Sequence, residues 1–531
     1  MKAISPAKTP TFPLIVRLAV LVVAVIYDVS IGSASGSQQG DFGRTVQLPP
    51  LLVMDTSWHY VSVPGLEVIS RCSVHLTNEF VRAYLLRQME LEVILPPSLQ
   101  FQSAQPPTMI LITPQMGKAM NKAIADLMLR PEEGNDPLTK GVPIEPIPQV
   151  DLWDAEREMT TIELDTEYNF VFTLHHTGML LEKRTPPLPY WFKEGIFTIS
   201  QKISWTNPVR IAFPKYPFSR SANSLVPIEK VLTASDDVAE GDKLFFERWR
   251  LQVMLFMRWA FDDPSLGRRQ ALWKFVELSS SEPATEELFR QCFGMGYSEM
   301  DINLKKYLRD LDDQFPVYLI YPRTMKLPEF TLRDANPVVL ARIQADFALK
   351  EAAFVGKKSP YIQKYMEKAE TTLLRYFQSG TRDPSLVSVL GLYYAEMHDD
   401  KRARPLLEEG AAAQVSRPSV YFTLGRILYR QYLDDRDSEI LTVAESTRIL
   451  STLKTGSRYQ PPQIETYKLA LDVWDHTSMT PSSEDLAFLK NGVTLFPGDE
   501  GLAAEVAALR EHAAPKDDVL RGPTIGRVNE P

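Results

Sequence analysis

The stretches "DPSLVSVLGLYYAE" (383–396) and "RPSVYFTLGRILYR" (417–430) show the same pattern twice, 34 residues apart. Each copy has a proline near its start and a Leu-Gly pair six residues later, at Pro384, Leu390 and Gly391 and again at Pro418, Leu424 and Gly425. Repetition at a fixed period of this length is typical of stacked helical units. This part of the chain is therefore expected to form helix pairs.

The residues after the first copy complete the pattern of one unit. Tyr394 lies three residues beyond Gly391, Ala403 lies twelve beyond it, and Leu407 follows four residues later. This order resembles the tetratricopeptide repeat (TPR), in which small residues let two helices approach and large residues fill the gap between them. The resemblance implies an α-solenoid with a concave groove for a protein or peptide partner.

The helical pattern extends over 336–514, enough for three to four helix pairs. A degenerate unit at 336–378 is expected ahead of the first clear copy, and a third copy is expected from about residue 461. In the second copy the expected small residue falls at Asp437, where an insertion disrupts the pattern. Only one unit is fully regular.

The N-terminal half has a different pattern. Two strand-like runs meet at Pro64-Gly65, a helix follows a cap at Thr77 or Asn78, and residues 107–114 form a short apolar run typical of a buried strand. Alternation of strands and helices predicts an α+β domain. The helical part that follows carries an aromatic stripe expected to lie in the core, made of Phe245, Trp249, Phe256 and Trp259.

The stretch "FTLHHTGMLLEKRTPPLPYWFKEGIFTIS" (172–200) predicts a helix, a proline-rich turn and a second helix that begins near Trp191 and carries Glu194. This layout resembles the peptidase-MA-like domains of gluzincin metallopeptidases, loosely over 57–310. In that family a His-Glu-x-x-His helix supplies two zinc ligands and the general base. A glutamate on the next helix is the third ligand, and Glu194 matches it.

The zinc motif itself is degenerate. His175 can stand for the first histidine, but His176 then occupies the position of the base and Met179 that of the second histidine. Starting at His176 instead places Thr177 and Leu180 at these positions. Catalytic zinc normally takes three protein ligands. The resemblance therefore implies a site without metal or cofactor; a rearranged zinc hydrolase that uses His175 and Glu194 is the alternative.

The N-terminus is typical of an export signal. Lys2 and Lys8 precede the apolar run Leu18–Ile26, and small residues follow up to a possible cleavage point after Ala34. An uncleaved anchor is the alternative. The pattern predicts an exported protein in the periplasm or outside a bacterial cell, with no membrane contact after removal of the signal.

Charge and cysteine content narrow the possible functions. The formal net charge is −9 and no basic cluster stands out, which argues against nucleic acid as a partner. Cys72 and Cys292 could form one disulfide or be two separate buried side chains.

The expected organisation is an export signal (1–34), a linker (35–56), a degenerate peptidase-MA-like domain (57–325), TPR-like repeats (336–514) and a flexible tail (515–531). The favoured function is a non-catalytic interaction protein. Besides the rearranged hydrolase, a structural or assembly component of the cell envelope is the other alternative.

Overall fold

The computed structural model describes residues 58–100, 104–113, 149–154, 156–164, 181–200, 203–204, 209–212, 225–235, 242–263, 265–311, 317–320, 327–355, 362–434 and 440–513. The expected export signal, the linker, the tail and the His175–Met179 segment lie outside these ranges. Among the described helices, none has the length and apolar content needed to span a bilayer.

A six-stranded mixed sheet forms the centre of the N-terminal half. Its order is β4-β5-β3-β2-β1-β9, with bounds Gln149–Trp153, Glu158–Glu163, Thr108–Ile112, Leu66–Ser70, His59–Val63 and Arg333–Asp334. β2, β3 and β5 run parallel to one another, whereas the pairs β1–β2, β1–β9 and β4–β5 are antiparallel. Gly65 turns the β1–β2 hairpin with a φ of +76°, which glycine adopts without strain. The predicted small mixed sheet is confirmed.

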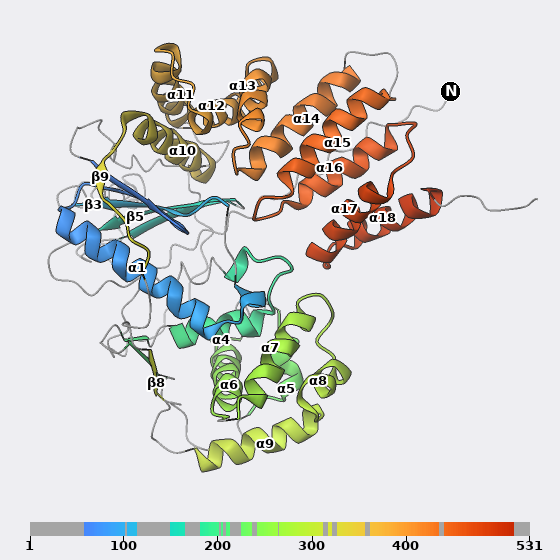
Figure 1. The fold of residues 1–531 in the computed structure, drawn as a ribbon. Helices are drawn as coiled ribbons and strands as arrows, with labels where there is room; N and C mark the ends of the chain where they lie inside the picture. Colours follow the sequence, from blue (N-terminus) through green and yellow to red (C-terminus); the bar gives the residue numbers. More distant parts are fainter. Residues whose placement is uncertain are drawn as a thin grey trace, which may run out of the picture.

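Each face of this sheet is covered by one helix (Figure 1). α1 (Val74–Ile94) packs on one face through Phe80, Val81 and Tyr84. α10 (Pro337–Val355) packs on the other through Leu340, Ile343 and Phe347. Alternate residues of each strand point to opposite faces. The two apolar clusters therefore lie on either side of one sheet.

A helical part hangs below the sheet in Figure 1 and is joined to it by the C-terminal end of α1. It contains α4 (Tyr190–Ser200), α5 (Ile228–Leu232), α6 (Lys243–Phe261), α7 (Gly267–Ser279), α8 (Glu286–Phe293) and α9 (Tyr297–Asp310). Trp249, Phe256 and Trp259 of the predicted aromatic stripe are buried in its core, and Phe245 packs against that core. A small sheet flanks this part, made of β6 (Ile203–Ser204), β7 (Val209–Ala212) and β8 (Val317–Ile320).

The C-terminal half is a solenoid of stacked helix pairs. Its helices after α10 are α11 (Ile362–Gln378), α12 (Pro384–Glu396), α13 (Asp400–Ala412), α14 (Pro418–Asp434), α15 (Val443–Gly456), α16 (Ile464–Asp475), α17 (Ser483–Leu495) and α18 (Glu500–Ala513). Each even-numbered helix from α10 to α16 contacts the next even-numbered helix as well as its own partner. This stacking of first helices on first helices is the arrangement of a solenoid.

α10 belongs to both halves. Its leucine, isoleucine and phenylalanine side chains pack on the sheet, whereas Ala341, Ala345, Ala348 and Ala352 on its other side pack in the core of the repeats. Small alanines allow α11 and α12 to approach α10 closely. The sheet and the solenoid are therefore joined through one shared helix.

Candidate functional site

Close helix packing within the repeats depends on glycines of the first helix in a pair. A Cβ atom on Gly391 would lie 2.9 Å from Leu407 Cδ2, and a Cβ atom on Gly425 would lie 2.7 Å from Leu453 Cδ2. Contacts this short essentially do not occur for real Cβ atoms, so a side chain at either position would displace the facing leucine where the partner helices cross.

The other repeat residues singled out from the sequence lie inside the same core. These are Leu390, Tyr394, Ala403, Leu407 and Leu424, and each exposes less than 5% of its surface. In the second pair, Leu453 occupies the place that Leu407 has in the first. The insertion around Asp437 only delays the start of α15, so the packing resumes further along the chain.

A second set of glycines was missed by the sequence reasoning. Cβ atoms on Gly410, Gly456 and Gly492 of the second helices would lie 2.1 Å from Ser388 Oγ, 2.5 Å from Tyr421 Cβ and 2.5 Å from Tyr467 Cδ1. A glycine near the end of each second helix was the available signal. Both helices of these pairs therefore supply close-contact positions.

One side of α14 carries partly exposed polar and aromatic residues at helical spacing; we call Phe422, Arg426, Tyr429 and Arg430 the α14 face. The Arg430 guanidinium pairs with Asp400 at 2.7 Å, and Arg426 lies 5.8 Å from the Phe422 ring centre. Burial lowers the pKa of Arg426, and Arg430 lowers it further, while Glu396 and Asp400 raise it.

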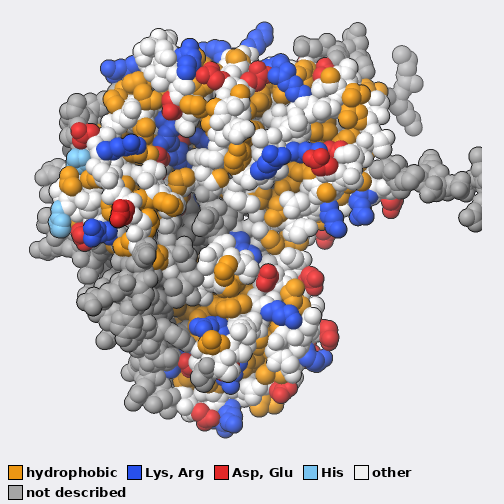
Figure 2. Space-filling model, viewed as in Figure 1, with side chains coloured by type: hydrophobic (Ala, Val, Ile, Leu, Met, Phe, Trp, Pro, Cys, Tyr) orange, Lys and Arg blue, Asp and Glu red, His pale blue; other side chains and the backbone are white. Residues whose placement is uncertain are grey.

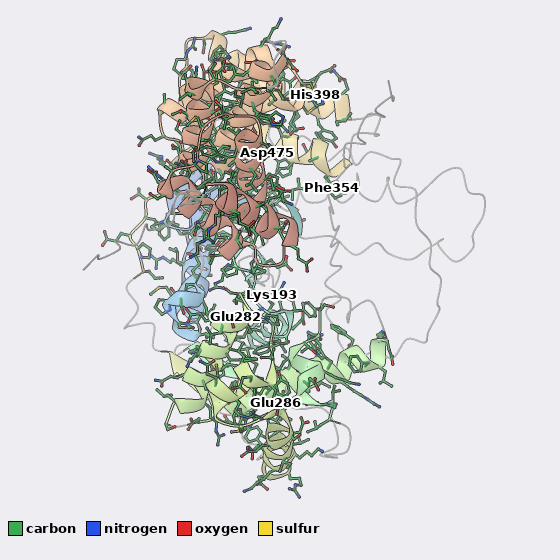
Figure 3. The ribbon with its side chains drawn as sticks, turned by 90° about the vertical axis from the view of Figure 1, so that its right-hand side faces the viewer. Lys193, Glu282, Glu286, Phe354, His398 and Asp475 are labelled. Atoms are coloured by element: carbon green, nitrogen blue, oxygen red, sulfur yellow. The ribbon has the colours of Figure 1, made fainter. Side chains whose placement is uncertain are left out.

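The neighbouring helix α16 ends beside this face. The Tyr429 hydroxyl lies 3.1 Å from His476 Nδ1, just after α16. Burial raises the pKa of Tyr429 to about 12, and Asp472 and Asp475 contribute to the rise. Figure 3 places Asp475 among the repeats. Aromatic side chains and arginine are enriched at protein–protein interfaces.

Glu194 lies in the first turns of α4 and faces α6. Its carboxylate pairs with the Arg250 guanidinium at 3.5 Å, and about a fifth of its side chain is exposed. Burial raises the pKa of Glu194, although Arg250 and Lys193 act to lower it. Lys193 lies at the end of the helical part that is nearest the repeats (Figure 3).

The residues around Glu194 dock α4 onto its neighbours. Trp191 is fully buried and its ring lies 5.6 Å from that of Phe256. A Cβ atom on Gly195 would lie 2.9 Å from Met257 Cγ, so α4 and α6 touch at this glycine. His175 and His176 lie outside the described residues. Within the ranges that the structure covers, no group of three or more His, Cys, Asp or Glu side chains could hold a metal ion.

The two cysteines are not joined to each other. Cys72 is buried under the sheet, where its thiol donates to the Ile112 carbonyl at 3.2 Å, and Cys292 is partly buried in α8. Burial raises the pKa of the Cys72 thiol to about 11, which keeps it protonated and unreactive. The possible disulfide is absent from this arrangement.

Comparison with protein-family models gives no match, and comparison with curated proteins gives none either. Among solved structures, similar chains include YrrB, described as a TPR protein with an unusual peptide-binding site. It is 13% identical, covers 32% of this chain and 90% of its own, and superposes with a TM-score of 0.22. MamA MSR-1 C2 is 16% identical, covers 33% of this chain and 87% of its own, with a TM-score of 0.19. At these TM-scores the TPR-like description rests on the helix pairs of this chain itself.

Proposed function

We propose that this protein is a non-catalytic interaction protein whose repeats bind a protein or peptide partner. The observation that carries the proposal is the α14 face, a partly exposed group of aromatic and arginine side chains on a closely packed helix stack. Solenoids use such surfaces for binding because neighbouring units hold them in a fixed arrangement. On the face shown in Figure 2, Lys and Arg are interspersed with Asp and Glu, which suits a protein partner better than nucleic acid.

The proposal also treats the sheet and the helical part as a degenerate gluzincin-like domain. Its support is the layout around Glu194, where a helix rich in aromatic contacts carries a glutamate that is paired with Arg250. The Arg250 guanidinium supplies the positive charge beside this carboxylate that a metal ion would supply in a zinc enzyme. Two candidate ligands, His175 and Glu194, fall short of the three that catalytic zinc normally has.

Metal analysis tests the non-catalytic part of the proposal. The purified protein and its His175→Ala and Glu194→Ala variants would be assayed for zinc and for peptide hydrolysis. We expect no stoichiometric zinc in any of the three. Zinc at one equivalent in the wild type and lost in both variants would overturn the proposal in favour of the rearranged hydrolase.

Partner capture with matched variants tests the binding surface. We expect proteins or peptides enriched by the wild type to be lost with Tyr429→Ala and Arg430→Ala. Arg448→Ala is the control, because Arg448 is also a half-exposed, ion-paired arginine but lies on α15. Equal capture by all variants would show that the α14 face is not the binding surface.

We further propose export to the bacterial envelope, which rests on the N-terminal Lys2, Lys8 and apolar run. Cell fractionation followed by N-terminal sequencing of the purified protein tests it. We expect a mature chain beginning near residue 35 outside the cytoplasm. A cytoplasmic protein with an intact N-terminus would contradict export.

A further inference from the structure

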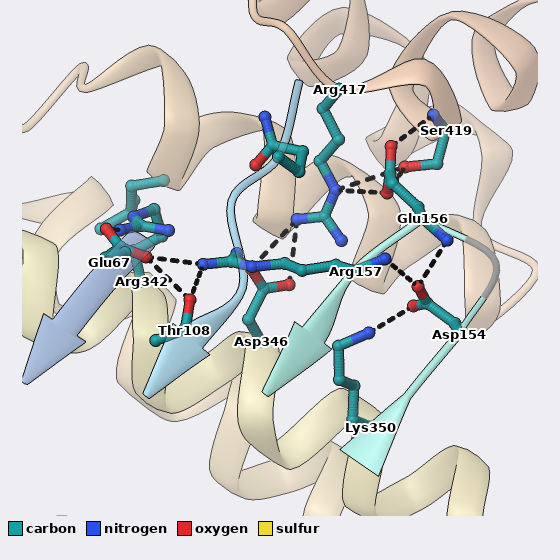
Figure 4. Close-up of polar contacts among 12 residues, drawn as sticks. Glu67, Thr108, Asp154, Glu156, Arg157, Arg342, Asp346, Lys350, Arg417 and Ser419 are labelled. Carbon is teal, nitrogen blue, oxygen red and sulfur yellow. Dashed lines mark hydrogen bonds and ion pairs between the residues drawn. The ribbon is translucent and has the colours of Figure 1, made fainter. Parts of the chain in front are cut away.

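Charged side chains, most of them buried, gather where the sheet meets the repeats (Figure 4). The sheet supplies three carboxylates and one guanidinium, from Glu67, Asp154, Glu156 and Arg157. The repeats supply three cations and one carboxylate, from Arg342, Lys350, Arg417 and Asp346. The sheet side thus carries a net negative charge, and the repeat side carries a net positive charge of the same size.

The part of this network nearest the sheet holds α10 on the sheet through ion pairs. Arg157 contacts both Asp346 and Glu67, and its interaction with Glu67 Oε2 measures 2.7 Å. Arg342 also pairs with Glu67. Since α10 has its own apolar contacts with the sheet, these ion pairs act on a helix that is already held in place.

The attachment of α14 is different in kind. The Glu156 carboxylate accepts from Ser419 N at 2.9 Å, from Ser419 Oγ at 2.7 Å and from Arg417 Nε at 3.0 Å. Arg417 Nη1 also donates to Asp346 Oδ1 at 2.9 Å. A carboxylate at the N-terminus of a helix is favoured by the exposed backbone N–H groups and the helix dipole.

Neighbouring contacts between the sheet region and the later repeats are polar as well. Gln105 Nε2 donates to the Ser416 carbonyl at 2.9 Å, and Ala104 N donates to the Gln460 carbonyl at 2.9 Å. In the described ranges, the apolar core of the repeats contains no residue of the sheet. The units from α14 onward are therefore held to the sheet by polar contacts.

We propose that Glu156, Asp346, Arg417 and Ser419 form a polar latch that fixes the direction of the repeats from α14 onward relative to the sheet. Solenoid units contact only their neighbours, so a chain of them bends easily unless another element holds it. α10 stays on the sheet through its apolar side, and the latch fixes the next point of contact. Opening the latch would let α14–α18 bend away from the sheet at their packing against α12 and α13.

The charged surroundings of the latch favour the closed state at neutral pH. Burial alone would raise the pKa of Asp346, but Arg417, Arg157, Lys350 and Arg342 outweigh it and lower that pKa. Burial alone would lower the pKa of Arg417, but Asp346, Glu156 and Asp154 raise it. Lys183 adds a further positive charge near Asp154, Glu156 and Glu158.

Glu156→Gln is the sharpest test, because Glu156 lies in the turn before β5 and its carboxylate accepts three hydrogen bonds of the latch. We expect small-angle scattering of the full-length variant at pH 7 to give a larger radius of gyration than the wild type. We also expect amide exchange of residues 416–422 to be at least about 10-fold faster, since Ser419 N loses a charged acceptor. Circular dichroism should be unchanged.

Asp301→Asn is the matched control, because Asp301 also accepts from a backbone N–H at a helix start, Ile228 N at 2.9 Å, but far from the latch. It should scatter as the wild type does. Arg417→Met is a second latch variant; should it fail to fold, Glu156→Gln alone decides. A radius of gyration of Glu156→Gln equal to that of the wild type would overturn the proposal, even if amide exchange of residues 416–422 were faster.

Discussion

At the scale of single residues, the repeats are built around positions where only glycine fits. Gly456 is buried against Tyr421, and its missing side chain brings α15 onto α14. Tyr421 cannot move aside because the nearest atom is its Cβ, which is fixed by the backbone. The close approach is thus encoded in two residues 35 positions apart.

Gly456→Ala is predicted to lower the free energy of unfolding by about 1–3 kcal/mol, because overpacking outweighs the better helix propensity of alanine. Chemical denaturation measures the change. Gly498→Ala is the control, since a Cβ atom there would meet nothing within 4 Å. Equal effects of the two substitutions would contradict the close-packing argument.

Glu351 gives a prediction about pH. It is buried on α10, and burial raises its pKa to about 7 although Lys368 acts to lower it. The folded state therefore holds the proton more tightly than the unfolded state, where the pKa is about 4.3. Stability contributed by protonated Glu351 is fully present below the unfolded pKa and is lost as the pH rises through about 7.

Glu351→Gln should accordingly gain stability over the wild type between pH 5 and pH 8, on the order of 2 kcal/mol at the higher pH. Urea unfolding at both pH values tests this. A difference between the two proteins that does not change with pH would show that Glu351 does not titrate in this range.

At the scale of single elements, helix starts are fixed by local side chains. α15 begins with a capping box in which the Thr442 hydroxyl accepts from Glu445 N and the Glu445 carboxylate accepts from Thr442 N at 2.9 Å. This cap sets where α15 resumes after the insertion, and so aligns Leu453 with Gly425. Local chemistry thereby restores the register that the insertion interrupts.

Thr442→Ala is predicted to cost about 1 kcal/mol, because a backbone N–H at the helix start loses its acceptor. Thermal unfolding measures it. Thr455→Ala removes the hydroxyl of a partly exposed threonine in the last turn of the same helix. It serves as the comparison and should change stability by less than half as much. A cost at Thr442 no larger than at Thr455 would contradict the role of the cap.

At the scale of the whole molecule, α10 makes one unit of the sheet and the repeats. Phe347 on its sheet side is almost fully buried, whereas Phe354 near its end is more than a third exposed (Figure 3). A substitution on the buried side should therefore destabilise both the sheet and the repeats. The expected boundary between residues 325 and 336 passes just before this shared helix.

Phe347→Ala should lower the free energy of unfolding by about 3–5 kcal/mol, as for other buried phenylalanines. Hydrogen exchange should show faster opening of both β3 and α12. Phe354→Ala is the matched control on the same helix, with an effect within about 1 kcal/mol. Faster exchange limited to the sheet would mean that the two halves open independently.

The sequence by itself determined the repeats, because Leu390-Gly391 and Leu424-Gly425 set local helix contacts that recur at a fixed spacing. It also determined the mixed sheet, since alternating and apolar runs are local signals. Only the tertiary structure decided that Arg250 pairs with Glu194 and that Glu156 meets Arg417. These partners lie 56 and 261 residues apart. No periodicity links such charges. Glu194 meets Arg250 because α4 packs on α6, and Glu156 meets Arg417 because α10 joins the sheet to the repeats.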